Sequence, residues 1–225
     1  MALKIMHWDI GGCEGCSVSM LRSIPMLPEG TEVKTMYTCD NIQEIQGGDL
    51  VFISGAVCMD DGESVETLKM LREQTTTVVA FGSCAAFCGI TRFSRGGQEP
   101  YPHHRSFSPI NRVIRVDYSL PGCPPPPQTI RSFIVSYEKN DENRLSLFRK
   151  LSSIKKLSGF DLLDEVVLTG LCIGCGACEI SCPTNAIRLI DKVPTLITER
   201  CIRCGTCYVR CPRATEILVS GGRRE

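Results

Sequence analysis

The sequence predicts an α/β domain with a mostly parallel β-sheet, followed by a small α+β domain. The first two thirds of the chain alternate short apolar segments with amphipathic ones, as strands and helices do around a parallel sheet. The last third contains a cysteine motif that occurs twice. A length of 225 residues suits one domain of about 150 residues and a smaller one. With 43% hydrophobic residues, the chain can build a core.

Short apolar runs that end near glycine or proline predict the strands of the first domain. The first run is followed by Gly11 and Gly12, and the fourth ends at Gly82. Because the carboxyl ends of parallel strands meet at one edge of the sheet, the loops after them form one surface. In chain order, the predicted strands are residues 3–8, 32–38, 50–53, 76–81 and 113–116.

Amphipathic segments between these strands predict helices. The clearest of them places Val65, Leu68 and Leu71 at helical spacing. A proline run precedes the last one, and proline favours the first turn of a helix. In chain order, the predicted helices are residues 17–24, 64–73 and 128–137.

A polar and charged segment separates the two predicted domains. Residues 138–160 are rich in charged residues, serine and asparagine, so we expect a linker that contains a surface helix. The first domain then covers residues 1–137, and the second covers residues 161–225.

The composition excludes several classes of function. Lys and Arg number 25 and Asp and Glu number 25, so the zero net charge gives no electrostatic basis for binding nucleic acid. The first residues lack the apolar core of a secretory signal, and we expect no transmembrane segment. We therefore expect a cytoplasmic protein, where disulfides are disfavoured, and we expect its 15 cysteines to serve mainly as metal ligands.

The last third carries the motif C-x2-C-x2-C-x3-C-P twice. Residues 172–183 read CIGCGACEISCP, and residues 201–212 read CIRCGTCYVRCP. This run is typical of bacterial ferredoxins, in which three thiolates in a tight turn bind one [4Fe–4S] cluster and the fourth binds the other. Two zinc sites are the alternative, but zinc requires two cysteine pairs per ion and needs neither the third cysteine nor the proline.

The ferredoxin rule assigns two sets of four ligands, each completed by a cysteine of the other repeat. The first set is Cys172, Cys175, Cys178 and Cys211. The second set is Cys201, Cys204, Cys207 and Cys182.

The first domain has cysteines close behind four of its predicted strands. These cysteines are Cys13, Cys58, Cys84 and Cys123. Cysteines at the ends of parallel strands are expected to cluster at one edge of the sheet. The pair in CEGC at 13–16 alone would be weak, since a redox dithiol or half of a zinc site has the same spacing.

Taken together, these motifs resemble a known family. CEGC, GSC before Ala85 and GCPP at 122–125 resemble the proximal-cluster site of [NiFe]-hydrogenase small subunits and of their complex I relatives. The separated first pair favours the hydrogenase side, because the complex I subunit carries adjacent cysteines there. VCMDDGESVE at 57–66, GITRFSRGG at 89–97 and PGCPP at 121–125 are similar to the gamma subunit of the F420-reducing hydrogenases of methanogenic archaea. In that family a flavodoxin-like domain is followed by a two-cluster ferredoxin domain.

The resemblance implies three [4Fe–4S] clusters and a hetero-oligomer. A large (alpha) subunit with the Ni–Fe centre would oxidise H2, and an FAD-bearing beta subunit would reduce coenzyme F420. This chain would carry electrons between them, as part of an oxidoreductase but without a catalytic residue of its own. The implied ligands of the first, proximal cluster are Cys13, Cys16, Cys84 and Cys123.

The chain departs from hydrogenase small subunits at one position. Those subunits usually carry Glu-Gly after the second strand of this region, whereas this chain has Ser54 and Gly55. Beside Cys58, Asp60 or Asp61 is an alternative ligand of the proximal cluster, and its harder oxygen would shift the cluster potential. An N-terminal cap of the helix at 64–73 is the other explanation for these carboxylates.

Two other functions remain open at the level of the sequence. The same three clusters would serve a related redox complex that has a different acceptor or a nickel-free large subunit. Alternatively, the chain would be a free-standing ferredoxin-like carrier whose first domain is structural. Three cysteines remain outside the predicted sites, and we expect them to be structural, with Cys58 the nearest to the proximal cluster: Cys39, Cys58 and Cys88.

Overall fold

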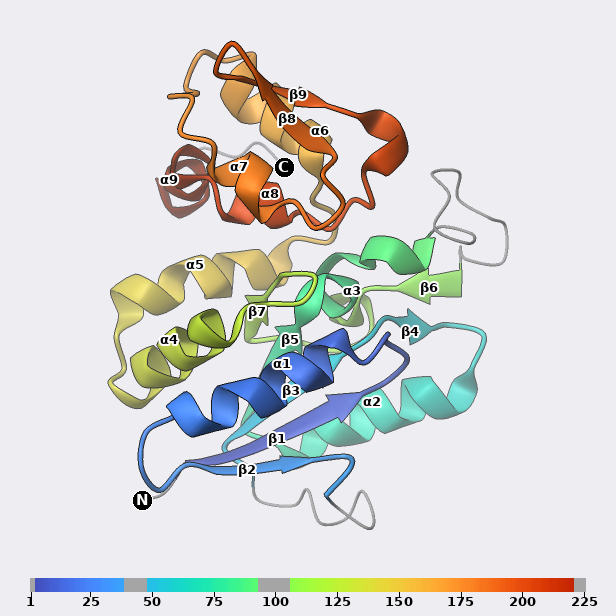
Figure 1. The fold of residues 1–225 in the computed structure, drawn as a ribbon. Coiled ribbons are helices and arrows are strands. Elements are labelled where there is room, and N and C mark those ends of the chain that lie inside the picture. The colour runs from blue at the N-terminus through green and yellow to red at the C-terminus, as the bar shows by residue number, and fades with distance from the viewer. Residues whose placement is uncertain (1–2, 39–47, 93–105, 221–225) are drawn as a thin grey trace.

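The computed structural model describes residues 3–38, 48–92 and 106–220. Cys39 and the last part of the GITRFSRGG motif, residues 93–97, lie outside the described residues. The chain forms two units, an α/β unit and a smaller one that sits above the carboxyl ends of its strands (Figure 1). Both predicted fold classes are confirmed.

The first unit is built on a five-stranded, wholly parallel sheet with the order β2-β1-β3-β5-β7. Side chains alternate between its two faces, as the period of a strand requires. Along β3, Leu50 and Phe52 face one side while Val51 and Ile53 face the other, and all four are fully buried. The strands are β1 (Lys4–Asp9), β2 (Glu32–Thr35), β3 (Leu50–Ser54), β5 (Thr77–Phe81) and β7 (Tyr118–Leu120).

Helices cover both faces of this sheet (Figure 1). On one face, α1 (Gly15–Ser23), α4 (Pro127–Glu138) and α5 (Glu142–Ser153) enclose a core that includes Phe52, Phe81 and Phe133. On the other face lie α2 (Gly62–Gln74) and the short α3 (Gly82–Phe87). A two-stranded antiparallel ribbon of β4 (Val57–Cys58) and β6 (Phe107–Ser108) lies beyond β3.

The second unit contains short helices and one hairpin. Its strands β8 (Ile187–Ile190) and β9 (Val193–Leu196) pair antiparallel. The cysteine motifs run into helices because Gly176 and Gly205, at φ of +78° and +68°, supply the left-handed turn that starts α7 and α8. The helices are α6 (Gly159–Leu162), its π-helical continuation Leu163–Val167, α7 (Ala177–Ser181), α8 (Thr206–Val209) and α9 (Pro212–Ser220).

The strand predicted at residues 113–116 is wrong, and the strand lies at β7 instead. Ile114 and Val116 are buried, but they follow a 3-10 turn (Ile110–Arg112) and form no ladder with the sheet. Pairing with β5 starts at Asp117, whose backbone N–H donates to the Val78 carbonyl at 3.0 Å and whose carboxylate accepts from the Val78 N–H at 2.9 Å. An apolar run thus supplies core side chains without becoming a strand.

The segment expected to be a linker with a surface helix does contain a helix, α5. Its inner side chains Leu145 and Leu151 are buried, and the helix lies beside β7 and α4. This helix therefore completes the cover of the first sheet and brings the chain to the second unit.

Candidate metal centres

Four cysteines of the first unit converge at the carboxyl edge of the sheet. Cys13 follows β1, Cys16 lies in the first turn of α1, Cys84 lies in α3 after β5, and Cys123 follows β7. Burial raises the pKa of the Cys16 thiol, and the neighbouring thiols of the other three raise it further. Burial, and then the neighbouring thiols of Cys123, Cys13 and Cys88, raise the pKa of Cys84 to about 12. We refer to this group as the first site.

A glycine makes room for the first site. Gly82 has a φ of +85°, and a Cβ at that position would overlap the Cys16 sulfur. Only glycine combines this backbone conformation with that clearance. The GSC motif thus places the thiol of Cys84 and keeps the space beside Cys16 open.

Of the remaining described cysteines, Cys88 lies against the first site. Cys88 is fully buried at the end of α3, and its thiol contributes to the raised pKa of Cys84. Cys58 pairs with Phe107 in the β4–β6 ribbon. That Cys58 lies near the proximal cluster stays a prediction, and Cys88 is an additional buried thiol beside Cys84.

A buried hydrogen-bonded network supports the loop of Cys13. The Asp9 carboxylate accepts from the backbone N–H groups of Gly11 and Gly12 at 2.9 and 2.5 Å. It also accepts from the Ser54 hydroxyl at 2.6 Å, and Ser54 is bonded in turn to His7 Nε2 at 2.9 Å. Ser54, which stands where hydrogenase small subunits usually carry a glutamate, thus contributes a neutral side chain to this network. The sequence signal for this network is an aspartate two and three residues before the N–H groups that it binds.

Asp60 and Asp61 each have a partner in the structure. Asp61 caps α2: its side chain accepts from the Glu63 N–H at 3.2 Å and from the Ser64 hydroxyl. Asp60 accepts from the hydroxyl of Ser106. The cap explanation therefore has direct geometric support at Asp61, and ligation by either carboxylate stays a prediction.

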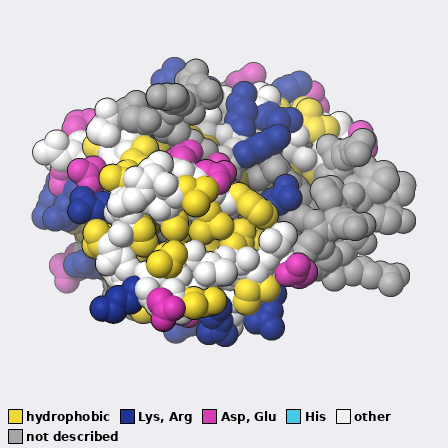
Figure 2. Space-filling model, turned by 90° about the horizontal axis from the view of Figure 1, so that it is seen from above, with side chains coloured by type: hydrophobic (Ala, Val, Ile, Leu, Met, Phe, Trp, Pro, Cys, Tyr) yellow, Lys and Arg dark blue, Asp and Glu magenta, His cyan; other side chains and the backbone are white. Residues whose placement is uncertain are grey.

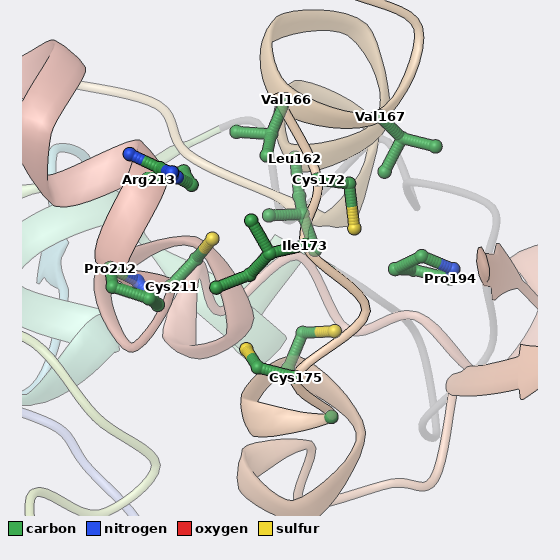
Figure 3. A pocket seen from close by; sticks show the side chains of 12 residues that line it. Leu162, Val166, Val167, Cys172, Ile173, Cys175, Pro194, Cys211, Pro212 and Arg213 are labelled. Atoms are coloured by element: carbon green, nitrogen blue, oxygen red, sulfur yellow. The ribbon is translucent and has the colours of Figure 1, made fainter. Parts of the chain in front are cut away.

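The first ferredoxin set lines a cavity in the second unit. Cys172, Cys175 and Cys178 come from the loop and first turn of α7, and Cys211 immediately precedes α9. Figure 3 shows Cys172 and Cys175 on one loop segment and Cys211 on the opposite side of the cavity. The rest of the wall is mainly apolar: Leu162, Val166, Val167, Ile173, Gly176, Pro194, Pro212 and Arg213.

The second set lines a separate cavity. Its members Cys201, Cys204 and Cys207 come from the loop and first turn of α8, and Cys182 comes from the end of α7. The cavity wall again includes apolar side chains, among them Ile187 and Leu196. Each cavity thus gathers three cysteines of one repeat and the fourth of the other, which is the exchange that the motif predicts.

Backbone N–H groups point at sulfur in both cavities. The Ala186 N–H donates to Cys182 Sγ at 3.1 Å, and the Gly174 N–H donates to Cys172 Sγ at 3.5 Å. Burial alone would raise the pKa of Cys182, but backbone hydrogen bonds from Ile187, Thr184 and Ala186 outweigh it and lower that pKa. Donors of this kind stabilise a thiolate and tune a bound cluster.

The three groups fit [4Fe–4S] clusters by donor set and shape. Each offers four thiols, and two of them surround a cavity with apolar walls. A cubane binds its thiolates through four separate iron atoms, so its ligands surround a space. Within the described parts of the chain, no three His, Cys, Asp or Glu side chains meet closely enough to hold a single metal ion.

The first site lies directly beside the second unit. Burial and then the neighbouring thiols of Cys204 and Cys13 raise the pKa of Cys123 to about 11. The Ser83 hydroxyl donates to the backbone carbonyl of Cys204 at 2.6 Å. No sequence motif predicts this contact, because it joins residues of different domains. None of the helices within the described ranges is long and apolar enough to cross a membrane.

Two family models match the chain. The model described as NADH ubiquinone oxidoreductase, 20 Kd subunit, matches residues 13–137. The model described as 4Fe-4S dicluster domain matches residues 153–216. The two matches cover the two units of the fold.

Similar proteins agree with these matches. The chain is 40% identical to the coenzyme F420 hydrogenase subunit gamma of Methanosarcina barkeri over 202 residues, which are 83% of this chain and 78% of that protein. It is 36% identical to the subunit of the same name from Methanococcus voltae, over 85% of this chain and 87% of that protein. A crystal structure of an NAD+-reducing [NiFe]-hydrogenase in the H2-reduced state superposes with a TM-score of 0.50 at 25% identity, covering 62% of this chain and 93% of that one.

Proposed function

The chain belongs to the family of coenzyme F420 hydrogenase gamma subunits, and from this we propose that it binds three [4Fe–4S] clusters and carries electrons from a nickel-bearing large subunit to a flavin-bearing one. It is an iron–sulfur electron-transfer subunit of an oxidoreductase. A [4Fe–4S] cluster supplies one-electron chemistry when bound, at a potential set by burial and by hydrogen bonds to its sulfurs. The observation that carries the proposal is the gathering of 12 cysteines into three groups of four.

The ligands that we propose are those of the three groups. The first site supplies Cys13, Cys16, Cys84 and Cys123. The second site supplies Cys182, Cys201, Cys204 and Cys207. The third site, which is the first ferredoxin set, supplies Cys172, Cys175, Cys178 and Cys211.

Contacts between the groups support a linear order of these sites. The thiol of Cys204 in the second site raises the pKa of Cys123 in the first, and the Ser83 hydroxyl donates to the Cys204 carbonyl. The neighbouring thiol of Cys178 in the third site contributes to the raised pKa of Cys207 in the second. These contacts support a second site between the other two, and we propose that electrons enter at the first site and leave from the third.

The third site opens on an apolar surface, which supports an exit to a partner protein. Figure 2 shows hydrophobic side chains gathered on the face seen from above. Large apolar side chains that flank this cavity along the chain are exposed: Leu168, Leu171, Ile173, Ile190 and Val193. Exposed apolar patches mark protein interfaces. We propose that the FAD- and F420-binding beta subunit docks here, and that the large subunit docks at the first site.

Cofactor analysis of the purified native complex tests the proposal. We expect about 12 iron and about 12 acid-labile sulfide per copy of this chain, the content of three cubanes. Nickel and flavin should copurify on other subunits, and H2 should reduce coenzyme F420. A measured content of about eight iron atoms per chain would rule out a cluster at the first site.

One residue favours a second function, in which the large subunit lacks nickel or the acceptor differs. Ser54 is neutral and fully buried where hydrogenase small subunits usually carry a glutamate. A complex with 12 iron but neither nickel nor H2-dependent reduction of a viologen would favour this second function. Recovery of this chain as a stable monomer with all its iron would instead favour a free-standing carrier.

A further inference from the structure

We propose that Ser83 is a positioning residue for electron transfer, and that its hydroxyl is the bonded link between the first and second sites. This inference rests on the proposed function and adds to it a specific route. Ser83 is not among the cysteine ligands, and it lies one residue before Cys84. Its side chain reaches from the first unit into the second.

The Ser83 hydroxyl makes one hydrogen bond in each direction. It donates to the Cys204 carbonyl at 2.6 Å and accepts from the Gly122 N–H at 3.1 Å. The backbone of Ser83 adds a third bond, from its N–H to the Gly122 carbonyl at 2.8 Å. Since Gly122 precedes Cys123, a continuous path runs from Cys123 through Ser83 to the backbone of Cys204.

The fold holds Ser83 at this position from several sides. The residue is the second of α3, which follows β5 directly, and the loop after β7 runs beside it because β5 and β7 are neighbours in the sheet. Its side chain is only 2% exposed, so water does not compete for the hydroxyl. A hydroxyl is the smallest side-chain group that donates and accepts at once.

Ser83 therefore affects two cluster sites with one group. Electron tunnelling weakens more steeply across a gap between unbonded atoms than along bonds, and a hydrogen bond shortens that gap. Without the hydroxyl, the Gly122 N–H and the Cys204 carbonyl would both be buried without this partner, and the two loops would be free to separate. The link consequently sets both the distance and the electronic contact between the two sites.

The test uses the complete native complex with Ser83→Ala, beside a matched variant, Ser119→Ala. Ser119 is a fully buried serine in neighbouring β7 whose hydroxyl has no hydrogen-bond partner among the described residues, so its removal deletes the same atom without a bond. Ser83→Thr restores a hydroxyl. The readouts are iron content, the magnetic coupling between the clusters of the first and second sites by electron paramagnetic resonance, and the rate at which H2 reduces the second-unit clusters.

We expect Ser83→Ala to keep about 12 iron per chain while it weakens the magnetic coupling and slows reduction of the second-unit clusters. Amide exchange at Gly122 should become about fivefold faster, the fold-change that corresponds to one lost hydrogen bond. Ser119→Ala should match the wild type in all readouts, and Ser83→Thr should recover the coupling.

Unchanged coupling and unchanged reduction rate in Ser83→Ala would overturn the inference, as would equal effects in Ser119→Ala. If Ser83→Ala loses iron, Ser83→Thr decides: a variant with full iron and wild-type coupling supports the link, and one with full iron and weak coupling overturns it. Failure of the proposed function would look different, because the wild-type complex itself would then lack iron at the first site or remain oxidised under H2.

Discussion

At the scale of single residues, burial keeps several thiols of the candidate sites neutral in the cluster-free chain. Burial and crowding by other thiols raise the pKa values of Cys84, Cys123 and Cys178 to about 12, 11 and 11. At neutral pH these thiols are therefore protonated in the cluster-free protein. Thiolate is the form that binds iron, so cluster insertion must release protons. This buried, crowded arrangement is stable only with neutral thiols or with a cation that compensates the thiolates.

Gly82→Ala tests how tightly the first site is built. Alanine at this position carries the cost of a left-handed backbone, about 1–2 kcal/mol, and its Cβ overlaps the Cys16 sulfur. We expect iron to fall from about 12 to about eight per chain. Gly30→Ala is the matched control, since Gly30 has a φ of +82° and no atom within 4 Å of a Cβ. Full iron in Gly82→Ala would contradict the proposed first site.

His7 makes the first unit sensitive to acid. Burial lowers its pKa from 6.5 to about 4, although the charges of Asp9 and Glu14 favour the protonated ring. Between these pH values the unfolded chain binds more protons than the folded one, so stability is complete above pH 6.5 and falls as the pH falls toward 4. At pH 5 the free energy of unfolding should be lower by about 2 kcal/mol than its value above pH 6.5.

Anaerobic urea unfolding at pH 7.5 and pH 5 measures this loss. His7→Gln removes the titrating ring, so its stability should change less between the two pH values than that of the wild type. The same pH dependence in both proteins would assign the acid sensitivity to other groups.

At the scale of secondary structure, sequence patterns locate elements that depend on local chemistry and miss those that depend on neighbours. The strands β3 and β5 lie within one residue of their predicted bounds. Each is a compact apolar run bounded by residues that interrupt regular structure, and a run as short as this favours a buried strand. The run at 113–116 was misplaced because the ladder is fixed by Asp117, whose partner Val78 lies 39 residues earlier. Pattern alone cannot identify that partner.

The candidate sites divide in the same way. The eight ferredoxin cysteines were assigned from spacing, because each repeat folds locally into a turn around three thiols. The roles of Ser54 and Ser83 were not predictable, since each one matters through a contact with a distant segment.

Substitutions at Asp60 and Asp61 distinguish the two explanations for these carboxylates, a cluster ligand and a cap of α2. We expect Asp61→Ala to lower the melting temperature by about 2–4 °C through loss of the cap, with iron unchanged. Asp60→Ala removes only the hydrogen bond with Ser106 and should melt close to the wild type. Loss of about four iron in either variant would show that its carboxylate is a cluster ligand.

At the scale of the whole molecule, the two units behave as one body around the first and second sites. One apolar cluster runs from α2 and α3 through Leu157 and Leu162 into the second unit, where it includes Tyr208 and Leu218. The Arg210 guanidinium also donates to Thr129 at 2.8 Å across the junction. A continuous core keeps the distance between the sites constant, which electron transfer at a steady rate requires.

Charge provides a test of the complete molecule. The chain has a formal net charge of zero, with its thiols neutral. A [4Fe–4S] core with four thiolates carries about −2 in its oxidised form, so three of them add about six negative charges. The raised pKa values of Cys16, Cys84 and Cys123 keep these thiols protonated in the cluster-free chain, so at these three positions the negative charge appears with cluster insertion. Anaerobic native electrophoresis of the loaded and cluster-free chain should therefore show a species more acidic by about six charges, and a difference of about four would indicate that only the second and third sites are filled.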